Sequence, residues 1–114
     1  MSKHLKTLTL GTVQDVIRLA EDYRLGEKAG EGKGLNQRYL ALHGKVESMT
    51  DDQKDELLAL MWVGRGDSGE TLDMWSDLLE TARLEDTEGK VGTLMGKASQ
   101  LGSYLPKGLE CLGA

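Results

Sequence analysis

The stretch TDDQKDELLALMWVG, which begins at Thr50, constrains the fold more than any other part of this sequence. Thr50 and Gln53 have the spacing of a capping box, in which each side chain accepts a hydrogen bond from the other residue's backbone N–H. Asp51 and Asp52 place negative charge at the positive end of the helix dipole. Leucine and methionine then recur at helical spacing. The stretch therefore predicts a helix that Gly64 stops.

A second helix is predicted soon after this one, in SGETLDMWSDLLETARLED. Ser68 or Thr71 can cap its start. Four of its apolar residues form a core-facing stripe with Leu78 beside it, namely Leu72, Trp75, Leu79 and Ala82. Because short links between helices favour antiparallel neighbours, residues 50–84 should form a helical hairpin with Trp62 and Trp75 near its closed end.

Two further helices are predicted before this hairpin. The first lies in TLGTVQDVIRLAEDYRLG, where Thr9 or Thr12 can cap its start and Gly26 can end it. The Gly-rich segment 26–34 has no apolar residue larger than Ala, so we expect a flexible loop there. A second helix follows in LNQRYLALHGKVESM.

The last third of the chain is less regular because it contains many glycines. One short helix is predicted around Val91 to Ala98, and Ser99 can cap a last helix that Pro106 either kinks or divides. The sequence thus predicts an all-α fold. We expect a single domain over residues 1–114, with about five short helices around a central antiparallel helical hairpin.

The charge and composition of the chain argue against several classes of function. The net charge is -5, so the basic face that nucleic-acid binding requires is not expected, and an anionic membrane surface would repel the chain. No apolar run approaches the roughly 20 residues that span a bilayer. The one cysteine, Cys111, can form neither an internal disulfide nor a zinc site alone, and we expect it to be structural. We predict a cytoplasmic protein without a cofactor or a metal.

The segment GRGDS, Gly64 to Ser68, is identical to the peptide by which matrix proteins bind integrins. Integrin binding requires secretion, and the N-terminal stretch MSKHLKTLTLGT has no secretion signal. A turn accounts for every letter. Gly64 ends one helix, Gly66 supplies a positive φ, and Asp67 and Ser68 cap the next helix. Arg65 meets the negative end of the first helix dipole. We therefore expect a turn and no integrin binding.

Two polar features of the helices have structural explanations. His43 lies on or beside the apolar stripe of its helix, and no partner at a catalytic spacing is visible, so a packed or half-exposed structural histidine is favoured. Four acidic residues share one face of the helix after the turn, and we interpret them as its solvated side rather than a cation site: Glu70, Asp73, Asp77 and Glu80.

Two hypotheses of function follow. The first is a non-enzymatic interaction or adaptor protein, or a homodimer, that acts through an apolar surface near the 50–84 hairpin. The second is a small-ligand-binding protein or enzyme with a pocket near His43, Arg65 and Asp67. The sequence favours the first, for which the candidate site residues, with interaction or structural roles, are Met61, Trp62, Arg65, Asp67 and Trp75.

Three segments resemble a family of small bacterial proteins of unknown function. LALMWVGRGD is similar to its helix-to-turn signature LMW-x-GRGD, SQLGSYLPKGL to its C-terminal segment, and TVQDVIRLAEDY to its opening segment. At Ser99-Gln100 the chain departs from the proline-led helix start of the family. The resemblance implies a bacterial, all-helical domain and no assigned activity.

Overall fold

The computed structural model describes residues 4–30, 32–66 and 72–113. Over these residues it contains six α-helices and one short 3-10 helix and no strand, so the all-α prediction is confirmed. In chain order the elements are α1 (Leu10–Lys28), α2 (Gly32–Glu47), α3 (Asp51–Arg65), η1 (Leu72–Met74), α4 (Trp75–Arg83), α5 (Thr87–Met95) and α6 (Leu101–Cys111). The molecule measures 40 × 27 × 26 Å.

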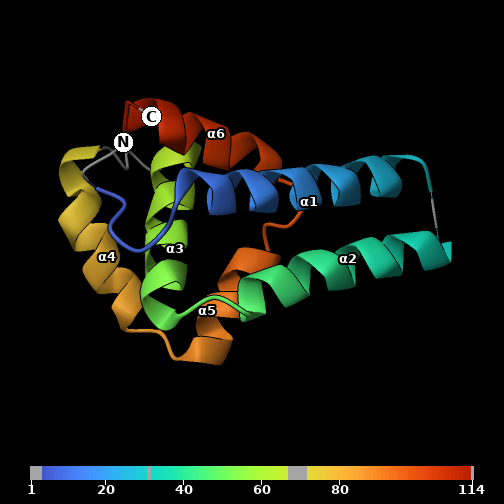
Figure 1. Ribbon diagram of the computed structural model, residues 1–114, viewed down its shortest axis with the longest axis horizontal. Coiled ribbons are helices and arrows are strands. Elements are labelled where there is room, and N and C mark those ends of the chain that lie inside the picture. Colours follow the sequence, from blue (N-terminus) through green and yellow to red (C-terminus); the bar gives the residue numbers. More distant parts are fainter. Residues whose placement is uncertain (1–3, 31, 67–71, 114) are drawn as a thin grey trace.

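Helix α3 is the centre of the molecule, with α4, α5 and α6 packed around it (Figure 1). Residues 54 to 61 are buried without a break, so α3 is buried on all sides rather than along one stripe. Its start is as predicted, because both hydrogen bonds of the Thr50–Gln53 capping box are present.

The expected central hairpin is therefore only part of the arrangement. Helices α3 and α4 do run antiparallel (Figure 1), but α6 also packs extensively against α3, and there are six α-helices rather than five. Helix α4 begins at Trp75, later than Ser68 or Thr71 would place it, because a 3-10 turn comes first. The proposed caps at Ser68 and Thr71 lie outside the described residues.

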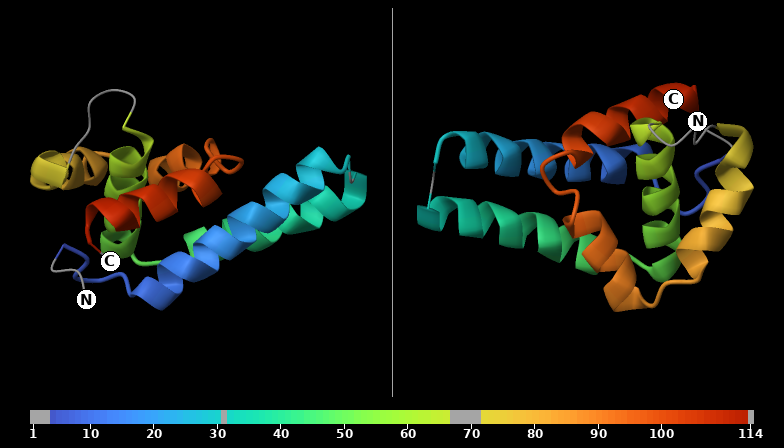
Figure 2. Two further views of the ribbon diagram at one scale, coloured as in Figure 1. Left: turned by 90° about the horizontal axis from the view of Figure 1, so that it is seen from above. Right: turned by 180° about the vertical axis from the view of Figure 1, so that it is seen from behind.

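Helices α1 and α2 form a second antiparallel pair that projects from the bundle (Figures 1 and 2). Thr9 caps α1 as predicted, accepting from the backbone N–H of Thr12. The predicted loop over 26–34 is too long, because α1 continues to Lys28 and α2 begins at Gly32. Gly26 is buried inside α1, and the glycine with positive φ is Gly30. Helical hydrogen bonding prevails here over the low intrinsic helix propensity of glycine.

The turn after α3 confirms half of the prediction for GRGDS. Gly66 has a φ of 65° and its N–H bonds to the carbonyl of Trp62, so it ends the helix in the left-handed conformation. Arg65 is the last helical residue, at the negative end of the dipole. Gly64 does not stop α3 but lies within it. Asp67 and Ser68 lie outside the described residues.

Gly64 instead allows α3 and α6 to cross at very short range. A Cβ added at Gly64 would overlap the carbonyl oxygen of Tyr104 and lie 2.8 Å from the backbone nitrogen of Gly108. A Cβ at Gly108 would overlap the carbonyl oxygen of Leu60. The two backbones touch because neither glycine carries a side chain. Helix α6 also continues through Pro106, which neither divides nor ends it.

Glu56 of α3 holds the N-terminal segment against the bundle. Its buried carboxylate accepts hydrogen bonds from the backbone N–H groups of Lys6, Thr7 and Leu8, at 2.9 to 3.1 Å, and from Thr7 Oγ1 at 2.7 Å. Leu5 and Leu8 of the same segment enter the core. Four donors around one carboxylate compensate for the cost of burying its charge.

Candidate functional site

A cleft of about 440 Å³ lies between α2 and α5. Its residues come from segments about 40 positions apart in the sequence, so only the packing of the two helices brings them together. The α2 side supplies one residue per turn of the helix. The lining residues are Tyr39, His43, Glu47, Thr87, Glu88, Val91, Gly92, Met95 and Gly96.

A row of three rings leads from α1 into this cleft. Tyr23 meets Tyr39 edge-on with ring centres 5.7 Å apart, and Tyr39 stacks on His43 at 6.2 Å with an interplanar angle of 27°. Partial burial raises the pKa of Tyr23, and the nearby carboxylate of Glu27 raises that pKa further. His43 is half-buried, as expected for a structural histidine, but it also faces a cleft.

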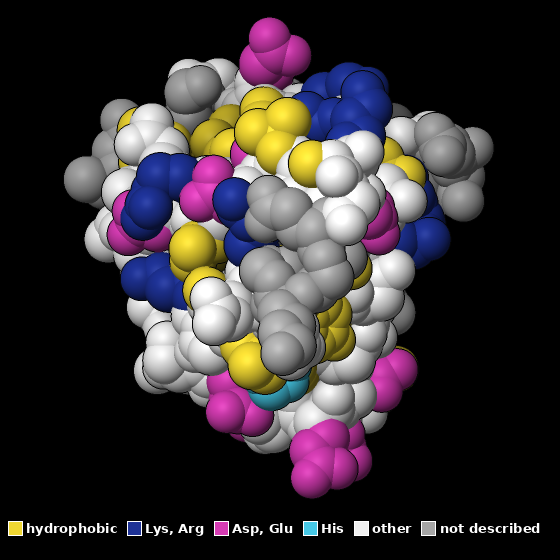
Figure 3. Space-filling model, turned by 90° about the vertical axis from the view of Figure 1, so that its right-hand side faces the viewer, with side chains coloured by type: hydrophobic (Ala, Val, Ile, Leu, Met, Phe, Trp, Pro, Cys, Tyr) yellow, Lys and Arg dark blue, Asp and Glu magenta, His cyan; other side chains and the backbone are white. Residues whose placement is uncertain are grey.

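The charged groups that line the cleft are acidic. Glu47 and Glu88 are both exposed, and no lysine or arginine lines the cleft among the described residues. Thr87 donates its hydroxyl to the carboxylate of Asp51 at 2.9 Å, and that carboxylate also lies 4.0 Å from Nζ of Lys54. Figure 3 looks at the molecule from the α1–α2 end. Lysine and arginine lie in its upper and middle parts, together with some carboxylates, and the Asp and Glu side chains visible at the bottom lie there without lysine or arginine. The cleft therefore favours cationic groups.

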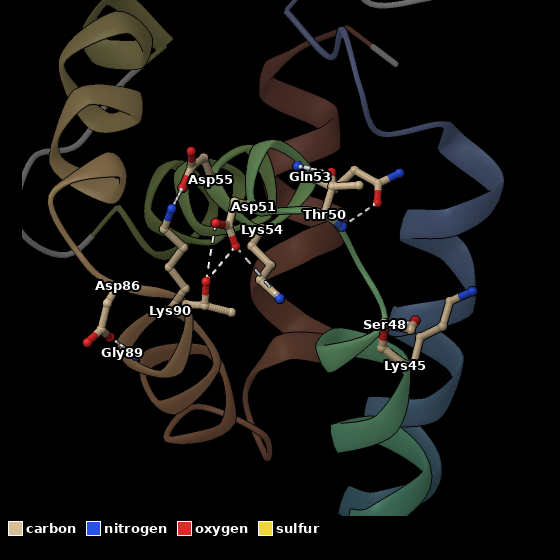
Figure 4. A network of polar contacts seen from close by, with 11 residues as sticks. Lys45, Ser48, Thr50, Asp51, Gln53, Lys54, Asp55, Asp86, Gly89 and Lys90 are labelled. Atoms are coloured by element: carbon tan, nitrogen blue, oxygen red, sulfur yellow. Dashed lines mark hydrogen bonds and ion pairs between the residues drawn. The ribbon is translucent and has the colours of Figure 1, made fainter.

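A buried ion pair holds α5, one wall of the cleft, against α3. Lys90 Nζ lies 2.8 Å from Asp55 Oδ1, and both side chains are buried (Figure 4). Arg83 of α4 lies farther from the same carboxylate, with its Nε 4.0 Å away. Removal of one partner would leave the other charge buried without compensation. Since Lys90 precedes two lining residues, Val91 and Gly92, this pair positions the cleft wall.

Gly92 leaves one side of the cleft open. A Cβ added at Gly92 would meet nothing within 4 Å, although Gly92 lies inside α5. Gly44 of α2 is equally open, but it does not line the cleft. The two glycines thus form a matched pair, in which a larger side chain at Gly92 fills the cleft and one at Gly44 does not.

The residues proposed from the sequence do not meet in one place. Met61 and Trp75 are buried in the core, and Trp62 is only half-buried. Arg65 does not line this cleft, so His43 and Arg65 do not share it. Asp67 lies outside the described residues. The apolar residues near the turn therefore fill the core for the most part.

The remaining polar residues are placed as follows. Three members of the acidic face of α4 and η1, Asp73, Asp77 and Glu80, are exposed as predicted, and Glu70 is not described. Cys111, expected to be structural, is exposed on α6. Over residues 4–30, 32–66 and 72–113, no cluster of three or more His, Cys, Asp or Glu residues is arranged to hold a metal ion.

Sequence reasoning missed the cleft, and the reason is physical. Glu47 and Glu88 each look like an ordinary surface carboxylate, and no spacing relates them. The buried residues Lys54, Asp55 and Glu56 were also hidden, because three charged residues in a row normally indicate a solvated surface. The only available signal was their position directly before the apolar run from Leu57 to Val63.

None of the described helices is both long and apolar enough to cross a membrane.

Comparison with known proteins places the chain in a family. No curated protein and no solved structure matches the chain. The family model described as "Protein of unknown function (DUF3775)" matches residues 39–114, which include α3, the GRGD turn and α6. The opening segment over residues 12–23, which had suggested the same family, lies outside that match. Because the match covers more than half of the chain, the protein belongs to the DUF3775 family.

Proposed function

We propose that this protein is a non-enzymatic protein-binding domain, and that its α2–α5 cleft receives a basic side chain of a partner protein. One observation carries the proposal. The cleft combines exposed carboxylates with an aromatic wall, and no lysine or arginine lines it among the described residues.

The lining chemistry suits lysine or arginine better than other side chains. Glu47 and Glu88 can form charge-assisted hydrogen bonds with an ammonium or guanidinium group. Tyr39 can contact the cation through its ring face, and Val91 and Met95 can pack against an aliphatic stem. The negative net charge of the chain would also increase the association rate with a basic partner.

The proposed surface differs from the one that the sequence suggested. The apolar residues near α3 and α4 are mainly core residues, with Met74 and Leu84 the large exposed ones there among the described residues. These two can extend an interface but do not form a cleft. The partner can be a different protein or a second copy of this chain, since exposed basic residues such as Arg18 are available.

A peptide titration followed by NMR tests the proposal. A short peptide with one central arginine should shift the backbone amides of His43, Gly92 and Gly96, and the shifts should weaken as salt is added. The same peptide with citrulline, the uncharged counterpart of arginine, should bind at least about tenfold more weakly. Gly92→Leu should abolish binding and Gly44→Leu should not. Equal binding of both peptides, or binding that Gly92→Leu leaves intact, would contradict the proposal.

Light scattering over a wide concentration range tests whether the partner is a second copy of this chain. If the protein forms a dimer that Gly92→Leu dissociates and Gly44→Leu does not, the cleft holds a second copy. A monomer at every concentration excludes the homodimer and leaves a different protein as the partner.

A small cationic molecule is the second candidate for the same cleft. Its volume of about 440 Å³ falls within the usual range of small-molecule sites, roughly 300 to 1,000 Å³. In the NMR titration, an isolated amine such as agmatine that binds more tightly than the arginine peptide would favour this candidate.

A further inference from the structure

A second cleft, of about 410 Å³, lies between the N-terminal segment and α4. Its lining differs in charge from that of the α2–α5 cleft. It contains His4, Lys6 and Arg83 together with Trp75, Ser76, Leu79 and Glu56. We propose that this cleft binds a carboxylate attached to an apolar or aromatic body.

The only carboxylate that lines this cleft among the described residues is already engaged. Glu56 accepts hydrogen bonds from three backbone N–H groups and from Thr7 Oγ1. These donors compensate its charge, so it opposes an incoming anion less than a free carboxylate would. Glu56 instead fixes the N-terminal wall, since one of its donors is the backbone N–H of Lys6.

The two cations of the cleft are available for a ligand. Lys6 is exposed, and the side chain of Arg83 is 58% exposed. The closest approach of Arg83 to Asp55 is 4.0 Å from Nε, which is beyond hydrogen-bond distance. Asp55 is paired more closely with Lys90, at 2.8 Å. A guanidinium with a planar set of donors suits a carboxylate, which it can bind through two parallel hydrogen bonds.

The apolar part of the ligand is specified by the aromatic and apolar residues that line the same cleft. Trp75 and Leu79 line the cleft on α4, and His4 meets the Trp75 ring edge-on at 5.8 Å with an interplanar angle of 75°. Ser76 adds a hydroxyl on the same helix. Two aromatic rings and a leucine beside two cations match an anion with an apolar body better than a bare inorganic ion.

Phenylacetate and its neutral counterpart phenylacetamide test this proposal by NMR. Phenylacetate should cause saturable shifts at the amides of Lys6, Ser76 and Leu79, and phenylacetamide should bind at least about tenfold more weakly. Lys6→Gln and Arg83→Gln should each weaken phenylacetate binding about tenfold. Lys6→Gln keeps the backbone N–H that bonds to Glu56, so the wall stays in place. Arg18→Gln, an exposed arginine on α1, is the matched control and should leave binding unchanged.

A peptide distinguishes between a chain terminus and a small free acid as the source of the carboxylate. If acetyl-Ala-Phe with a free C-terminus binds at least as tightly as phenylacetate and its amide does not bind, the ligand is a chain terminus. If phenylacetate alone binds, the ligand is a small free acid. Absence of saturable shifts with both acids, equal binding of phenylacetate and phenylacetamide, or full binding by the folded Arg83→Gln variant overturns the proposal.

Discussion

The α3–α6 crossing and the α2–α5 cleft both contain helical glycines, yet the glycines act in opposite ways. At the crossing, Gly64 and Gly108 bring two backbones into contact, and a single added carbon at either one would overlap a carbonyl oxygen. At α2 and α5, an added carbon at Gly44 or Gly92 meets nothing. The first pair closes the core, and Gly92 keeps a cleft open. The same residue type thus serves packing in one region and access in the other.

The largest expected effect comes from adding a methyl group at the crossing, where the two backbones already touch. Gly64→Ala should lower the free energy of unfolding by about 4 kcal/mol, because the new Cβ can be placed only if the two helix backbones separate. Urea unfolding followed by tryptophan fluorescence measures the change. If the free energy of unfolding falls by less than about 1 kcal/mol, α6 can move aside easily. The glycines of the crossing would then not differ from Gly44 and Gly92 as argued above.

A smaller loss is expected when the cleft wall is released from α3. Lys90→Met should lower the free energy of unfolding by about 3 kcal/mol, because it leaves the buried carboxylate of Asp55 without its close partner. Adding Asp55→Leu should recover most of that loss, since an apolar pair of similar size can replace a buried ion pair. If Lys90→Met alone is neutral, the ion pair does not position the wall, and another contact must do so.

The smallest effect on the free energy of unfolding, with the opposite sign, is expected at Gly44 and Gly92, where an added Cβ meets nothing. Gly44→Ala and Gly92→Ala should each raise the free energy of unfolding by up to about 1 kcal/mol, because alanine is the better helix former and nothing obstructs its methyl group. Thermal unfolding of the two variants beside Gly64→Ala measures the contrast directly. Destabilisation by Gly92→Ala would mean that α5 packs more tightly against α2 than the cleft implies.

Local signals predicted the elements that depend on local chemistry. The capping box at Thr50, the cap at Thr9 and the left-handed glycine at Gly66 were each confirmed, because a cap or a turn is specified by residues within three or four positions. Errors arose where glycine signals are ambiguous. Gly26 and Gly64 suggested helix ends, but both lie inside helices.

The candidate sites were much less predictable than the helices. His43 was singled out, but the opposite wall of its cleft comes from α5, and nothing in the spacing of the two segments brings Glu88 near Glu47. Met61 and Trp75 were proposed for a surface, but both are buried apart from the small exposed part of Trp75 that lines the second cleft. Apolar periodicity cannot distinguish a core stripe from an interface. The roles of Lys90 and Glu56 depend on partners far along the chain.

By itself the sequence determined that this protein is all-helical, where several helices begin, and that its charge is acidic. These properties depend on short-range hydrogen bonding and on composition. Only the tertiary structure decided that α3 is enclosed on all sides, that Gly64 meets α6, and that two clefts of different charge open on the surface. Such features arise from contacts between distant segments, and a helix pattern shows which face is apolar but not which other segment that face will meet.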